Sequence, residues 1–189
     1  MQVESFVLFS PTCVKPNNDN GKKCQPELNK GYKTNNDTLK SWHPKIELLD
    51  ELLNLNFDDK VKKDLPIRVA YQNAIEIESG SSKTTIYPYT FEDALVIENK
   101  ESFKTIAGST GLLKKMVEAS TKEDIEEFAK EAYLIINDKQ AKKAEFALDV
   151  LYFEDPKKIK TPTYIKEGLD WIEDQLKVSK QGLIINSNG

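Results

Sequence analysis

The sequence predicts a mixed α/β domain in which a small sheet with a β-hairpin is followed by a mostly helical C-terminal half. Segments at residues 67–78 and 84–87 alternate apolar and polar residues, which is the pattern of β-strands. After residue 120, apolar residues recur every three or four positions, which is the spacing of amphipathic helices. The 189 residues, 39% of them hydrophobic, suffice for one domain with its own core.

The first elements are predicted to be a strand, a loop and a short helix. Residues 3–10 are rich in Val and Phe and are expected to form a strand that ends at Pro11. Residues 15–33 are dense in Asn, Lys, Gly and Pro, which is typical of a long loop. Residues 34–38 offer several N-cap candidates for a short helix at residues 39–42.

A β-hairpin is expected in the middle of the chain. After Pro66, residues 67–72 and 74–78 alternate in the manner of strands. Residues 79–82, with the sequence SGSS, are typical of a turn, and residues 84–87 then form the returning strand.

The rest of the chain is expected to be helical. Helices are predicted at residues 46–55, from residue 91 onward, and at residues 111–119, 122–137, 139–153 and 164–178. Thr90 can cap the helix from residue 91, where Glu92 and Asp93 lie in the first turn and interact favourably with the helix dipole. The last helix is expected to bury four apolar side chains: Ile165, Leu169, Ile172 and Leu176. We therefore expect one domain over residues 1–178 and a tail at residues 179–189.

The counts of cysteine and histidine exclude several kinds of active site. The two cysteines, Cys13 and Cys24, are too few for a four-cysteine zinc site, and we expect two reduced thiols. The single histidine, His43, precedes Pro44 and is expected in a turn. A three-histidine zinc site is therefore excluded by count, and a lone histidine before a proline is more typical of a turn than of a catalytic base.

The overall charge does not favour a polyanionic partner. The net charge is −4, from 27 basic and 31 acidic residues, so nucleic-acid binding would need a local basic patch or bound cations. Arg68 is the only arginine, so phosphate contacts would have to come mostly from lysines, backbone amides or cations. The sequence has no apolar run of the length of a membrane span and no convincing signal peptide. We therefore expect a cytoplasmic protein that does not enter a membrane.

Four stretches of the chain together carry a family resemblance. Residues 22–42 contain TNNDTLKSW, which is similar to a T-S-N-x-T-L-K-x-W signature after a polar loop, and residues 67–72 (IRVAYQ) are similar to a recurrent strand. Residues 89–99 contain YTFEDAL followed by EN, which is similar to R-[ST]-F-E-D-A-[FL]…E-N, and residues 142–148 (KKAEFAL) are similar to a K-x-x-F-A helix. In this order the stretches resemble the C-terminal TOPRIM nuclease region of OLD-family (overcoming lysogenization defect) ATP-dependent endonucleases. The resemblance implies a TOPRIM-like partial sheet.

The resemblance also implies metal-dependent cleavage of DNA. In the family, carboxylates hold two divalent cations, Mg²⁺ or Mn²⁺, which activate water and stabilise the leaving oxygen of a phosphodiester. By motif match, Glu92 falls on a metal-site glutamate and Lys143 on a catalytic lysine near the scissile phosphate. The residues alone also allow structural roles, Glu92 as a first-turn glutamate and Lys143 within a solvated lysine cluster at residues 139–143. Asp93 and Glu98 are expected on the helix surface.

The chain departs from the family pattern at the first metal-binding strand. That strand ends in a D-x-D-S type motif in the family, whereas the corresponding residues 5–9 are followed here by Ser10 and Thr12. Neutral hydroxyls are poor substitutes for carboxylates at a divalent-cation site. Tyr89 stands where the family usually has arginine, and Asp19 lies further along the loop. The upstream glutamate segment and the ATPase have no counterpart in this sequence, and it contains no G-x-x-x-x-G-K-[ST] site for ATP.

We therefore interpret the chain as a truncated or diverged OLD-family relative that is impaired or inactive alone, which leaves open whether it is an enzyme. It is either a gene remnant or one part of a split system whose ATPase lies on another chain. The alternative is a non-catalytic interaction module that partners an OLD-type ATPase or nuclease. Simple nucleic-acid binding is a third hypothesis, which the acidic balance disfavours. The candidate partners are thus DNA, an ATPase subunit or a second copy, with Mg²⁺ or Mn²⁺ as the cofactor of any activity.

Overall fold

The computed structural model describes residues 5–9, 13–15, 23–79 and 82–186, and it confirms a mixed α/β fold with a helical C-terminal half. The strands are β1 (Ser5–Phe9), β2 (Cys13–Val14), β3 (Lys23–Cys24), β4 (Lys33–Thr34), β5 (Val61–Lys62), β6 (Ile67–Tyr71), β7 (Ile75–Ser79) and β8 (Ser82–Ile86). The α-helices are α1 (Asp37–Ser41), α2 (Leu49–Leu53), α3 (Phe91–Glu98), α4 (Lys100–Lys104), α5 (Gly111–Ser120), α6 (Ile125–Ile136), α7 (Lys143–Phe153) and α8 (Thr163–Asn186). Two 3₁₀ turns lie at Asp58–Lys60 and Pro156–Lys158.

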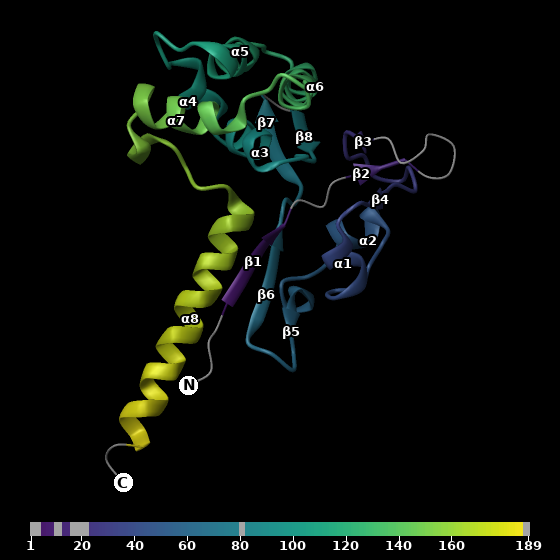
Figure 1. Ribbon diagram of the computed structural model, residues 1–189, viewed down its shortest axis with the longest axis vertical. Helices are drawn as coiled ribbons and strands as arrows, with labels where there is room; N and C mark the ends of the chain where they lie inside the picture. Colours follow the sequence, from purple (N-terminus) through teal and green to yellow (C-terminus); the bar gives the residue numbers. More distant parts are fainter. Residues whose placement is uncertain (1–4, 10–12, 16–22, 80–81, 187–189) are drawn as a thin grey trace.

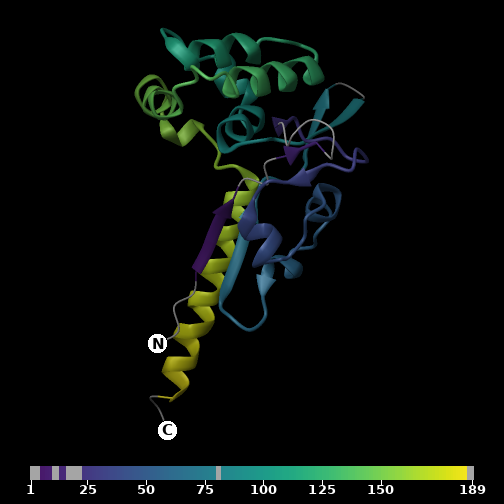
Figure 2. The same cartoon turned by 45° about the vertical axis from the view of Figure 1, so that its right-hand side comes forward.

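The main sheet has three strands in the order β1-β6-β5, with β6 in the centre. β1 runs parallel to β6, in a register that pairs Ser5 with Ile67 and Phe9 with Tyr71, and β5 pairs antiparallel on the other side. In both views α8 runs along β1 and β6, whereas α1 and α2 lie on the side away from α8 (Figures 1 and 2). The sheet is therefore covered by helices on both faces.

Alternation along β6 assigns its side chains to the two faces of the sheet. Val69 and Tyr71 are fully buried in the core that β6 shares with α1 and α2, and the Tyr71 hydroxyl donates to the Leu52 carbonyl oxygen at 2.8 Å. Ala70 lies between them in sequence and packs instead against Tyr164 of α8. Because successive side chains of a strand point to opposite faces of the sheet, β6 can pack against helices on both faces.

Arg68 is fully buried on the α8 side of the sheet. Its Nη2 atom donates to Glu167 Oε2 of α8 at 3.2 Å, and its guanidinium carbon lies 4.2 Å from the centroid of the Phe57 ring. The Nε and Nη1 atoms of Arg68 have no hydrogen-bond partner among the described residues. A second buried cation, Lys60, donates to Asn73 Oδ1 at 2.8 Å. Glu167 is therefore the carboxylate that compensates the charge at the centre of the sheet.

The largest core lies in the second part of the fold, where the hairpin of β7 and β8 shares one apolar cluster with helices α3 to α7 and β8 contacts α6. This part of the fold lies beyond the end of α8 at Thr163 (Figure 2). The predicted hairpin is confirmed, with β7 and β8 paired antiparallel from Ile75 and Ile86 to Ser79 and Ser82. The largest fully buried side chains of this core are Phe103, Leu113, Met116, Phe128, Ile136 and Phe146. The predicted helices from residue 91 to residue 153 are confirmed: α5 is one residue longer than predicted, α6 and α7 are shorter, and α4 is an addition.

The N-terminal elements differ in part from the prediction. The short helix α1 is confirmed, since Asn36 accepts hydrogen bonds from the backbone nitrogens of Thr38 and Leu39 as an N-cap. The segment expected as a loop also contributes β3 and the start of β4, which pair on either side of β2 in a small sheet. Antiparallel pairing of β2 and β3 brings the backbones of Cys13 and Cys24 into register. The expectation of reduced thiols is wrong because Cys24 is disulfide-bonded. A cytoplasmic location stays a prediction.

The last helix buries a different stripe from the one the sequence indicated. The side chains of Tyr164 and Trp171 are buried against the sheet, whereas Leu169 and Leu176 are 47% and 49% exposed. Both stripes are apolar and lie about 100° apart around the helix, so its periodicity did not distinguish them. Residues 179–186, expected in the tail, are the last turns of α8. Among the described residues, no helix is long and apolar enough to cross a membrane.

The N-terminus of α3 is closed by Asp93, which the sequence placed on the helix surface. Asp93 is in fact buried, since its carboxylate accepts hydrogen bonds from the backbone nitrogens of Tyr89, Thr90 and Ala94 and from the Thr90 hydroxyl. Thr90 and Asp93 form a reciprocal capping box. Burial raises the pKa of Asp93 to about 6, against the opposing effect of these donors.

We predict that Glu167→Gln destabilises the fold by about 1–3 kcal/mol, because it leaves the buried Arg68 guanidinium without a compensating charge. Glu167 is about one-third exposed, which places this value below that of a fully buried pair. The measurement is urea unfolding near neutral pH. The matched control is Glu118→Gln, which removes an exposed pair with Lys114 on α5 and should change stability by less than about 0.5 kcal/mol. Equal effects of the two variants would contradict the role of Arg68.

We predict that Asp93 makes the protein less stable as pH rises from about 4 to about 6. Because its folded pKa is raised from 3.8 to about 6, the native state binds more protons than the unfolded state in this window. The loss attributable to this group is about 3 kcal/mol across the window, with no further change above it. Urea unfolding at a series of pH values should show this slope in the parent chain but not in Asp93→Asn. Parallel stability curves would show that Asp93 ionises normally.

Candidate functional site

Glu92 and Lys143, which were predicted separately from two motifs, lie side by side in the structure. Glu92 is in the first turn of α3 and Lys143 is the first residue of α7, and 51 positions separate them in the sequence. The Lys143 Nζ atom is 3.1 Å from Glu92 Oε2, with the glutamate mostly buried and the lysine exposed. The fold therefore brings together the two residues that the family resemblance singled out.

The pair opens onto a cleft that we call the Glu92–Lys143 cleft. It has a volume of about 530 Å³ and is lined by Lys23, Tyr89, Thr90, Phe91, Glu92, Ile136, Asn137, Asp138, Lys139 and Lys143. Three lysines and two carboxylates give this cleft a positive balance on a chain whose net charge is −4. A local excess of lysines is the feature that attracts a phosphate group to an otherwise acidic surface.

Two of the cleft lysines were outside the predicted site. Lys139 was assigned to a solvated cluster, and the sequence signal that could have identified it is that the same cluster contains Lys143. Lys23 lies in β3, whose position depends on the small sheet, so no local pattern indicates its approach to α3 and α7. Among the described residues that line the cleft, Lys23 of β3 comes earliest in the sequence.

Tyr89 is a buried, uncharged residue in the lining of the cleft. Its ring packs edge-on against Tyr133, with 5.4 Å between centroids, and its buried hydroxyl has no hydrogen-bond partner among the described residues. Burial raises the pKa of Tyr89 to about 12. The hydroxyl is therefore protonated at neutral pH and can donate a hydrogen bond, but it cannot supply the charge of an arginine.

The carboxylates of the described residues do not fit a pair of divalent cations. Glu92 is held by the Lys143 ammonium group, and the neighbouring Asp93 accepts four hydrogen bonds inside the helix cap. Within the described ranges, no group of three His, Cys, Asp or Glu side chains is arranged to hold a metal ion. Mg²⁺ sites need oxygen ligands clustered in near-octahedral geometry. Ser10, Thr12 and Asp19 lie outside the described residues.

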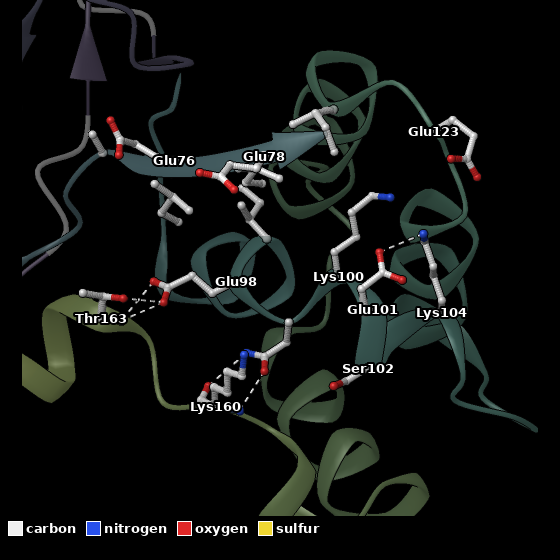
Figure 3. A pocket seen from close by; sticks show the side chains of 16 residues that line it. Glu76, Glu78, Glu98, Lys100, Glu101, Ser102, Lys104, Glu123, Lys160 and Thr163 are labelled. Atoms are coloured by element: carbon white, nitrogen blue, oxygen red, sulfur yellow. Dashed lines mark hydrogen bonds and ion pairs between the residues drawn. The ribbon is translucent and has the colours of Figure 1, made fainter. Parts of the chain in front are cut away.

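A second and larger cavity, of about 820 Å³, lies between β7, the α3–α4 junction and the start of α8 (Figure 3). Its charged lining consists of Glu76, Glu78, Glu98, Glu101, Glu123, Lys100, Lys104 and Lys160. Lys100 is largely buried, with Nζ 5.3 Å from the centroid of the Phe128 ring, and burial lowers the pKa of Lys100. Lys104 is paired with Glu101 at 2.8 Å.

On one side of this second cavity, polar groups form hydrogen bonds between the end of α3 and the segment at the start of α8 (Figure 3). Glu98 accepts hydrogen bonds from the backbone nitrogen and the hydroxyl of Thr163, the latter at 2.7 Å. Asn99 donates to the Lys160 carbonyl oxygen at 2.9 Å and accepts from its backbone nitrogen at 2.7 Å. These contacts attach the start of α8 to the end of α3. The Glu98-Asn99 element of the family resemblance therefore has a structural role here, and the Glu92–Lys143 cleft is the candidate functional site.

Comparisons of the chain with protein-family models, with curated proteins and with solved structures find no match. The family resemblance therefore rests on the four sequence stretches and on the residues that they carry.

Proposed function

We propose that this chain is a TOPRIM-derived relative of OLD-family DNA endonucleases that is catalytically impaired when alone. The observation that carries the proposal is the ion pair of Glu92 and Lys143, because two motifs that are far apart in sequence place their predicted site residues 3.1 Å apart. Proteins contact DNA phosphates mainly through lysine and arginine, and the cleft around the pair contains three lysines.

The impairment follows from the ligands that remain. A two-metal site needs several carboxylates, and Glu92 is the motif-matched carboxylate of the cleft. Its charge is already compensated by Lys143, so a cation would have to displace this ammonium group. Lys143 can stabilise negative charge on a phosphate, but an ammonium group cannot generate a nucleophile from water. The chemistry of this cleft therefore favours holding a phosphate over hydrolysing it.

The second candidate is a non-catalytic interaction module that partners an OLD-type ATPase or nuclease. It is supported by the outer face of α7, where the apolar side chains of Leu148, Leu151 and Tyr152 are exposed. Exposed apolar side chains gathered on one helix are typical of a contact surface. Genomic neighbourhood separates the two origins considered for the first candidate, a split system and a gene remnant. An adjacent ATPase gene supports a split system, and an upstream reading frame for the missing TOPRIM half supports a remnant.

We predict that the purified chain, with Mg²⁺ or Mn²⁺ and no partner, nicks supercoiled plasmid no faster than its Glu92→Ala variant. The reason is that one motif-matched carboxylate cannot hold two hydrated cations. The measurement is the rate of conversion of supercoiled to open-circular DNA on a gel. Glu145→Ala is the matched control, since Glu145 is also a first-turn glutamate but does not line the cleft.

One pattern of rates would contradict this prediction. It is metal-dependent nicking that is robust in the parent chain and in Glu145→Ala but lost in Glu92→Ala. Such a result would show that Glu92 still supports catalysis, with ligands supplied by other residues. Equal background rates in all three proteins are the expected outcome.

A further inference from the structure

The apolar stripe of α8 that does not face the sheet has a regular spacing. It consists of Ile165, Leu169, Ile172 and Leu176, which are separated by four, three and four positions. Leu169 and Leu176 are about half exposed, and Ile165 and Ile172 are partly buried. The alternation of three and four is the spacing of the core positions of a coiled coil. The stripe therefore has the pattern of a helix that packs against a second helix, and none of the described residues covers it fully.

The stripe lies on the flank of α8 away from the central strand. Tyr164 and Trp171 face the sheet, and Glu167 reaches Arg68 of β6 from the other flank. With about 100° between successive residues, the stripe and Glu167 project to opposite sides of the sheet-facing line. The stripe forms a seam along α8 that does not include the Arg68–Glu167 ion pair.

A neighbouring strand adds to this apolar surface. Leu8 of β1 is in register with Ala70, which packs against Tyr164, so Leu8 is on the α8 side of the sheet. The side chain of Leu8 is 46% exposed. In the described part of the fold, β1 is also an edge strand, paired only with β6. α8 runs beside β1 (Figure 1), so the apolar seam of α8 and the open edge of β1 lie in the same part of the fold.

The charges beside the seam are complementary to those of a second copy of the same helix. If Ile165 and Ile172 are d positions and Leu169 and Leu176 are a positions, Lys166 and Glu173 are the two e positions. In an antiparallel pair of identical helices, the e positions of one helix face those of the other. Lys166 of each copy would then approach Glu173 of its partner. A parallel pair would instead place the e positions beside Gly168 and Gln175, which carry no charge.

We propose that this chain forms a homodimer in which the α8 helices of two copies pack antiparallel through Ile165, Leu169, Ile172 and Leu176. A two-fold axis crosses the seam between Leu169 and Ile172, so that Leu169 of each copy packs against Ile172 of the other and Ile165 against Leu176. The dimer goes beyond the proposed function and does not depend on it.

The arrangement is consistent with the surroundings of α8. Packed helices are about 8–10 Å apart, which brings the two β1 edges toward each other across the same axis in antiparallel orientation. Ile165 also lines an apolar groove of about 410 Å³ between α7 and residues 156–162. The partner helix beyond Leu176 runs toward this groove. The antiparallel arrangement therefore places the partner helix over the seam and directs its C-terminal end toward the groove.

The first experiment is sedimentation equilibrium of the full-length chain and two variants. The parent chain is expected to dimerise, and Leu169→Lys, which places a charge in the seam, is expected to be monomeric at concentrations up to about 1 mM. Leu134→Lys is the matched control, because Leu134 is equally apolar and is exposed on α6 outside the seam. Circular dichroism confirms that the variants stay folded. A monomeric parent chain, or a dimer that Leu169→Lys leaves intact, overturns the proposal.

The second experiment tests the antiparallel register by exchange of charge. Lys166→Glu and Glu173→Lys each turn two attractive contacts of the dimer into repulsive ones and are expected to raise its dissociation constant about four- to thirtyfold. The double variant restores both attractions and is expected to return the constant to within about threefold of the parent value. Asp170→Lys, which changes charge on α8 at a b position, is the control for loss of contacts within the helix, such as Lys166 with Asp170. Failure of the double variant to recover rules out this register.

Discussion

The burial of Arg68 is the constraint on which the arrangement of the main sheet depends. A guanidinium group without solvent contact needs a compensating charge, and here the carboxylate of Glu167 provides it from α8. The ring of Phe57 covers the same group 4.2 Å away. Because the arginine is on the central strand, α8 and the segment before β5 must both close over the sheet to exclude water. The position and rotation of α8 are therefore set by one ion pair as much as by apolar contact.

That rotation determines which surfaces of the protein are left uncovered. With Glu167 directed at Arg68, the aromatic side chains of Tyr164 and Trp171 pack on the strands. The neighbouring stripe that includes Leu169 then cannot reach the sheet, although its apolar character would favour burial. An ion pair that resists rotation of the helix is a specific constraint, because apolar contact alone would allow either stripe to pack inward. The exposed seam of α8 thus follows from the way in which the buried charge is compensated.

The sequence was most informative where a structure is specified by neighbouring residues. Thr90 before an acidic first turn predicted the start of α3, and the alternation on either side of the SGSS turn predicted the hairpin. Rotation of α8 was not predictable, because two adjacent apolar stripes satisfy the same periodicity. At the cleft, the motifs indicated Glu92 and Lys143 individually, but their direct ion pair depends on how α3 packs beside α7. Lys23 was missed because its place is set by strand pairing over a distance.

The adjacent carboxylates of Glu92 and Asp93 show why residue type alone does not identify a site. Both lie in the first turn of α3, where the helix dipole favours a negative charge. A rotation of about 100° separates them, which directs Asp93 inward to the backbone donors of the cap and Glu92 outward to Lys143. The carboxylate of Asp93 accepts hydrogen bonds from the donors of the helix cap, and burial raises the pKa of Asp93. The carboxylate of Glu92 is mostly buried but faces Lys143 and the lysine-lined cleft, so the role of each residue is decided by the face of the helix on which it lies.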